Sequence, residues 1–179
     1  LVRSRGLGDV YKRQVNLPSP EGMVRIEAGE YTVGVPNGDD FHASQREIRL
    51  NPYRIDQFEV TNAQYQEFLN ATGNQPPATW PGEEDHPVVG VTWQDAAVYC
   101  TWANKRLPTE AEWEAAARGP GPEPGLHPWG DDPLAGGQVN QLPLERTYPA
   151  GAYDFNQSPL GVYDLSGNVW EWVGEPYES

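Results

Sequence analysis

The sequence predicts an α+β fold that is rich in loops and poor in regular secondary structure. Its 179 residues include 19 Gly and 18 Pro, which interrupt helices and strands. Three segments nevertheless carry helix caps and helical periodicity, while only short stretches alternate as strands do. Seven Trp and nine Tyr supply large apolar surfaces, so we expect a core built mainly from aromatic side chains.

Two regions near the beginning are predicted to form strands. Residues 23–27 and 31–33 flank a short turn-like segment at 28–30, a pattern typical of a β-hairpin. Residues 47–60 alternate only in part, and Pro52 interrupts them. Because proline cannot donate a ladder hydrogen bond, we expect an edge strand or two short strands there.

Three helices are predicted from their first residues. Each begins after a threonine that is followed three residues later by a side chain able to complete a capping box. Glycines at positions 73 and 119 end the first and third helix. The pairs are Thr61 with Gln64, Thr92 with Asp95, and Thr109 with Glu112. Glu110, Glu112 and Glu114 alternate around the third helix, so we expect charges that favour the helix dipole and a solvated face.

Charge is distributed unevenly along the chain, whose formal net charge is -14. Residues 1–14 carry four basic residues and one acidic residue, while the remainder is acidic. We interpret 1–14 as a non-native artefact segment, the alternative being a genuine basic tail, and 15–179 as a partial domain. An acidic surface repels phosphate backbones, which disfavours a nucleic-acid partner. No apolar run is long enough to predict a membrane span.

Cys100 is the single cysteine of the sequence, so neither an intrachain disulfide nor a two-thiolate metal site can form. It shares the predicted apolar face of the second helix with Trp93, Ala96 and Ala103. A cysteine in such a position is usually a small core residue, and we interpret it as structural.

The final segment offers a candidate calcium site. Asp164 and Glu171 bring carboxylates, and the carbonyl groups of Gly167 and Val169 could face the same point if the chain curls. Calcium accepts such mixtures of oxygen ligands, and Gly167 allows the positive φ of a curl. The alternative is that Asp and Glu simply cap a Gly-Asn turn. Trp170 and Trp172 alternate as core residues of a strand do.

Several long blocks resemble one family. Residues 86–96 (HPVVGVTWQDA), 99–103 (YCTWA), 105–114 (KRLPTEAEWE) and 117–119 (ARG) are similar to the signature of the formylglycine-generating-enzyme, or sulfatase-modifying-factor, family. Residues 23–34, 58–65 and 161–172 agree with it. The resemblance covers about residues 22–173 and implies a fold related to C-type lectins.

The resemblance also implies metals and a partner. Family members bind a structural calcium ion at the positions of Asp164, Gly167, Val169 and Glu171, and a second one beginning at Asn140 and Gln141. Catalytic members oxidise a cysteine of a sulfatase polypeptide to formylglycine with a copper ion held by two cysteines. The positions of those cysteines lie beyond the Trp-Glu-Trp block, so no catalytic residue is assigned here and the fragment is predicted to be inactive.

Three functional hypotheses follow from the resemblance. The first is part of a copper-dependent formylglycine-generating oxidase. The second is a non-catalytic binding or scaffold module of the same fold, in a bacterial surface protein or beside a kinase domain. The third is an enzyme of ergothioneine-type carbon–sulfur bond formation, which would have a histidine-rich iron domain upstream.

Overall fold

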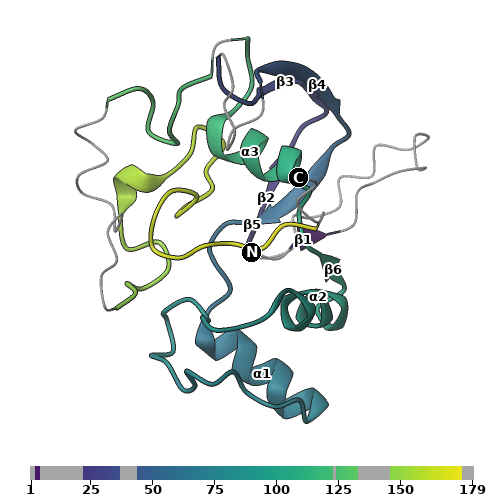
Figure 1. The fold of residues 1–179 in the computed structure, drawn as a ribbon, viewed down its shortest axis with the longest axis vertical. Helices are drawn as coiled ribbons and strands as arrows, with labels where there is room; N and C mark the ends of the chain where they lie inside the picture. Colours follow the sequence, from purple (N-terminus) through teal and green to yellow (C-terminus); the bar gives the residue numbers. More distant parts are fainter. Residues whose placement is uncertain (1–2, 5–21, 37–43, 123, 133–145, 175–179) are drawn as a thin grey trace.

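A computed structural model describes residues 3–4, 22–36, 44–122, 124–132 and 146–174 (Figure 1). Short strands and short helices are joined by long irregular segments, which confirms a loop-rich mixture of the two. The strands are β1 (Arg3–Ser4), β2 (Met23–Ile26), β3 (Gly29–Val33), β4 (Arg46–Leu50), β5 (Tyr53–Asp56) and β6 (Lys105–Arg106). The helices are α1 (Asn62–Thr72), α2 (Trp93–Trp102) and α3 (Glu110–Arg118), with a 3₁₀ turn at Asp154–Asn156.

The strands β2 to β5 form one long antiparallel ribbon. β2 pairs with β5 from Met23↔Asp56 to Ile26↔Tyr53, and β3 pairs with β4 from Gly29↔Leu50 to Val33↔Arg46. The register is the same in both ladders, so β3 continues β2, and β5 continues β4 beyond a break at Asn51 and Pro52. The predicted hairpin between residues 23–27 and 31–33 is therefore wrong, because these segments run on in one direction. The two short strands predicted around Pro52 are confirmed.

The ribbon divides between two sheets. One has four strands in the order β2-β5-β1-β6, and the other consists of β3 and β4. β1 lies between β5 and β6 and falls within residues 1–14. The interpretation of that segment as an artefact stays a prediction.

All three predicted helix starts are confirmed. Thr61, Thr92 and Thr109 are N-caps with extended backbones, and each forms a complete capping box with the residue three positions later. α1 ends at Gly73 in the left-handed conformation. The local chemistry of the caps therefore fixes where each helix begins.

Two apolar clusters make up the interior. One joins the four-stranded sheet to α3 and the final segment, and the other lies between α1 and α2, which occupy one end of the molecule in Figure 1. Residues 57–61 lead from β5 to α1 and so connect the two. The first cluster includes Ile26, Tyr31, Tyr53, Ile55, Ala116, Val162 and Leu165, and the second includes Val60, Tyr65, Phe68, Leu69, Tyr99, Cys100 and Leu107.

The glutamates of α3 match the expectation only in part: Glu110 and Glu112 lie in the first turn and Glu110 is exposed, but Glu112 and Glu114 are not on a solvated face. Glu112 is only 8% exposed, and its carboxylate accepts hydrogen bonds from both terminal nitrogens of Arg106, at 2.7 and 2.6 Å. The Glu114 carboxylate accepts from the Gly34 amide and from Arg118. The solvated face is interrupted at Glu112 because Arg106 of β6 lies beside the start of α3 and brings a cation to this carboxylate.

Candidate functional site

The site predicted from the sequence lies in a tight curl of the chain. Asp164, Gly167 and Asn168 all have positive φ, of 59°, 98° and 60°. Glycine adopts this conformation freely, and Asp and Asn tolerate it better than most residues. The backbone therefore curls around residues 164–168, as the calcium interpretation requires.

Asp164 is buried at the beginning of this curl. Its carboxylate accepts hydrogen bonds from the backbone amide of Gly151 and, at 3.3 Å, from the side-chain amide of Asn156. Asn156 also donates to the carbonyl oxygen of Ser166, at 3.0 Å. Asp164 therefore fastens the curl to residues 151–156, which is the capping role of the alternative interpretation. A carboxylate retains acceptor capacity after two hydrogen bonds, so this role leaves room for a cation.

The other end of the curl is fastened by Asn168 and Glu171. The Asn168 side chain accepts from the Tyr148 amide at 2.9 Å and donates to a carboxyl oxygen of Glu59 at 2.7 Å. The Glu171 carboxylate accepts from the indole nitrogen of Trp113, on α3. The predicted ligand residues Asp164 and Glu171 therefore lie near a third acidic residue, Glu59.

Glu59 is the site residue that the sequence analysis missed. It is only 3% exposed, and its Oε1 atom has no hydrogen-bond partner. Burial, followed by the nearby carboxylates of Glu171 and Asp164, raises the pKa of Glu59 to about 9, against the hydrogen bond from Asn168. A signal was present in the sequence, because Glu59 lies between the apolar residues Phe58 and Val60, two positions before the helix cap Thr61, where burial is expected.

The pKa of Asp164 is raised as well. Burial is the largest cause, and the hydrogen bonds from Gly151 and Asn156 oppose it. Carboxyl groups held together in the interior cannot easily all ionise, unless a positive charge lies among them. The curl and Glu59 are therefore electrostatically suited to a cation.

The donor set fits calcium in chemistry but is not fully convergent. All of its atoms are carboxylate or carbonyl oxygens, as calcium prefers. Glu59, Asp164 and Glu171 do not each place an oxygen within 4.8 Å of the other two, a separation met among the described residues only by Glu83, Asp85 and His86. One ion at the curl would thus be held by backbone carbonyls and at most two of these carboxylates as they stand.

A pocket of about 920 Å³ opens beside these residues. Glu59, Asn168 and Glu171 line one part of it, and valines and tyrosines from α1, α2 and residues 88–91 line another. Trp170 and Trp172 stand at its edge and are 102% and 46% exposed. Their predicted place in the core is wrong, because residues 169–172 form no strand and carry these indoles outward.

Residues 8–179 match the model of the sulfatase-modifying factor enzyme 1-like domain. The chain belongs to this family. A formylglycine-generating enzyme from Thermomonospora curvata is 32% identical over 217 residues, which cover 87% of this chain and 71% of that protein.

Two further proteins are similar to this chain. A serine/threonine-protein kinase, pkn1, from Chlamydia caviae is 35% identical over 176 residues, covering 87% of this chain and 28% of that protein. The solved structure of PvdO from Pseudomonas aeruginosa superimposes with a TM-score of 0.68 at 26% identity, covering 87% of this chain and 71% of that one. The described part of this family member therefore has a fold shared with known structures.

Two further expectations concern the second calcium site and Cys100. Asn140 and Gln141, where a second calcium site is expected to begin, lie outside the described residues. Cys100 is buried in the cluster between α1 and α2, and burial raises the pKa of its thiol to about 11. A single buried cysteine that resists ionisation does not fit a copper ion held by two cysteines. None of the described helices is long and apolar enough to cross a membrane.

The raised pKa of Glu59 predicts a pH-dependent stability in calcium-free solution. The folded protein favours the protonated carboxyl, so its contribution to stability is complete below about pH 4.5 and is lost as the pH rises towards about 9. Glu59→Gln keeps an acceptor for Asn168 but cannot ionise. We therefore expect urea unfolding with a chelator present to show a smaller loss of stability between pH 5 and pH 9 in this variant.

The matched control for this experiment is Glu67→Gln, which changes an exposed glutamate of α1. It should leave the wild-type pH slope in place. Equal slopes for Glu59→Gln and the wild type would contradict the assignment of a buried, hard-to-ionise carboxyl to Glu59.

Proposed function

We propose that this chain is the calcium-stabilised scaffold part of a formylglycine-generating-type domain, related in fold to C-type lectins, and that it does not itself oxidise a cysteine. The observation that carries the proposal is the buried carboxyl of Glu59, with one oxygen unpartnered, beside a curl that presents Asp164 and Glu171. Such an arrangement is unfavourable unless protons or a cation compensate it.

Calcium is the cation that this donor set favours. It takes six to eight oxygen ligands, and the curl offers the carbonyl groups of Gly167 and Val169 together with carboxylates. Asp164 and Glu171 would supply those carboxylates, with Glu59 beside them. The charge of the ion would allow the carboxyl groups to ionise and would tie residues 164–171 to the start of α1.

Oxidation of a sulfatase polypeptide would then be the activity of a longer protein that contains this domain. That chemistry needs a copper ion between two cysteines, and this sequence contains only Cys100. In such a protein the present residues would contribute the calcium-bound scaffold and the wall of the pocket. Both the copper and the sulfatase partner then depend on residues outside this chain.

A non-catalytic binding module is the second candidate. The alignment with the chlamydial kinase extends over 176 residues, against 217 with the Thermomonospora curvata enzyme, for the same 87% of this chain. Fewer insertions thus separate this chain from the kinase-associated relative. The exposed Trp170 beside the pocket also suits a partner surface. The ergothioneine-type alternative has no described residue in its favour and stays a hypothesis.

Calcium is expected to stabilise the protein through the curl. The melting temperature should rise when calcium is added to chelator-treated protein, since the ion binds the folded state preferentially. Asp164→Asn and Glu171→Gln should lose most of this increment, while Glu67→Gln should retain it. Each variant is compared with itself with and without calcium, which separates lost binding from lost stability. An unchanged melting temperature on addition of calcium to the wild type would refute the proposed site.

The chain is expected to leave a substrate cysteine unmodified. We would incubate it with copper, oxygen and a sulfatase-motif peptide, and follow the peptide by mass spectrometry. The Thermomonospora curvata enzyme serves as the positive control under the same conditions. Conversion of the cysteine to formylglycine by this chain would contradict the proposal that it does not itself oxidise a cysteine.

A further inference from the structure

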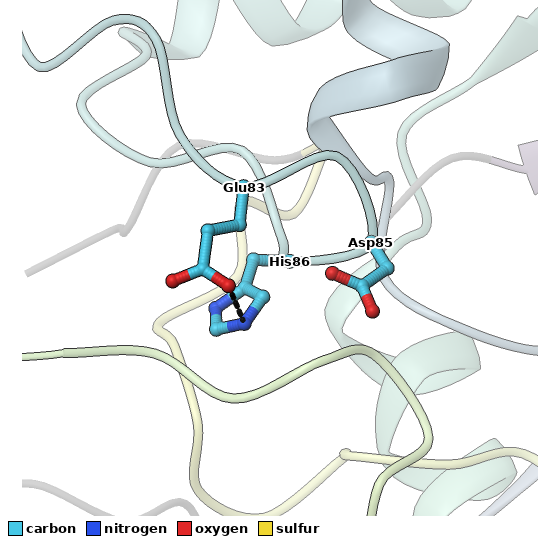
Figure 2. Close-up of side chains that lie close together, drawn as sticks. All are labelled: Glu83, Asp85 and His86. Carbon is cyan, nitrogen blue, oxygen red and sulfur yellow. Dashed lines mark ion pairs between the residues drawn. The ribbon is translucent and has the colours of Figure 1, made fainter.

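A second group of metal-ligating side chains lies on the loop between α1 and α2. Glu83, Asp85 and His86 each place one potential ligand atom within 4.8 Å of the other two. Figure 2 shows the Glu83 carboxylate against the imidazole ring, with the Asp85 carboxylate standing to one side. Glu83 and His86 also line the pocket. The group therefore sits where a ligand can reach it from solvent.

The backbone of this loop is fixed by other parts of the molecule. The Asn62 side chain donates to the Glu83 carbonyl at 2.8 Å, and the Ala63 amide donates to that of Glu84 at 2.9 Å. The Asn62 amide reaches the His86 carbonyl at 2.8 Å, and the amide of residue 150 reaches that of Asp85 at 2.9 Å. The carbonyl groups of four successive loop residues thus accept hydrogen bonds from other parts of the chain, which preorganises the three side chains.

The imidazole ring of His86 is held by a neighbour at each of its two nitrogens. Its Nδ1 atom lies 2.8 Å from the hydroxyl of Thr147, and its Nε2 atom lies 3.3 Å from a Glu83 carboxylate oxygen. A hydrogen bond on one ring nitrogen commonly fixes the ring of a metal-bound histidine. Two ligands on a tetrahedral zinc ion, with bonds of about 2.0–2.1 Å, lie about 3.3 Å apart. The observed spacing of Nε2 and the carboxylate therefore equals that of neighbouring zinc ligands.

We propose that Glu83, Asp85 and His86 bind a zinc-class divalent cation, with the imidazole Nε2 and one carboxylate oxygen from each acidic residue as its ligands. The side chain of Glu83 is 81% exposed, and Asp85 is exposed as well, so both carboxylates can rotate towards the ion. Three protein ligands leave a fourth position for water or for a group entering the pocket.

The chemistry of the donors separates this site from the proposed calcium site. Imidazole nitrogen favours zinc and similar transition metals, whereas calcium prefers oxygen ligands alone. The carboxyl groups around the curl belong to Glu59, Asp164 and Glu171, and none of them is a residue of the loop 83–86. The two sites share no ligand, so either proposal can fail without the other.

The test is isothermal titration of chelator-treated protein with zinc chloride in the presence of excess calcium. The wild type should bind one zinc ion at this site. Asp85→Asn and Glu83→Gln should each weaken binding by about ten-fold or more, because each removes a charged ligand. The matched control is Glu84→Gln, an exposed carboxylate between the two ligands that does not belong to the group, and it should retain the wild-type affinity.

Cobalt in place of zinc gives a second readout, since its visible absorption reports four-coordinate geometry. The wild type and Glu84→Gln should show this absorption, and Asp85→Asn should lose it. The proposal is overturned if the wild type binds no zinc, if Glu84→Gln weakens binding as much as Asp85→Asn does, or if Glu59→Gln abolishes it.

Discussion

The buried carboxyl group of Glu59 is the constraint on which the rest of the site depends. It lies where the chain passes from the sheet to α1, and Asn168 connects it to the curl at residues 164–168. Asp164 and Glu171 add to the negative potential around it. An uncompensated charge in this position would oppose folding, so the arrangement requires either a proton on Glu59 or a cation nearby. The proposed calcium site is the second of these solutions.

The start of α1 positions both proposed metal sites. Glu59 lies two residues before the cap residue Thr61, and Asn62, the first residue of the helix, is buried and holds the loop that carries Glu83 and His86. Val60 pairs with Val88 through a backbone hydrogen bond of 2.9 Å. One short segment thus fixes the edge of the pocket, the buried carboxyl of Glu59 and the half-buried imidazole of His86, and a shift of α1 would disturb all three together.

The sequence predicted those features that depend on neighbouring residues. The helix starts are correct because capping boxes are local, and the curl is correct because Gly167 and Asn168 accept positive φ. Strand pairing was not predictable in the same way, since β2 and β3 pair with strands that follow much later in the chain. Burial of Glu59 and Glu112, and exposure of Trp170, are likewise set by tertiary contacts that no local pattern records.

A crystal structure of the protein grown with calcium, refined against data that resolve metal–oxygen distances, examines the calcium assignment most directly. We predict one calcium ion at the curl, with six to eight oxygen ligands at about 2.3–2.6 Å that include the carbonyls of Gly167 and Val169 and a carboxylate of Asp164 or Glu171. Density for water alone at the curl, with Glu59 still unpartnered in saturating calcium, would contradict it.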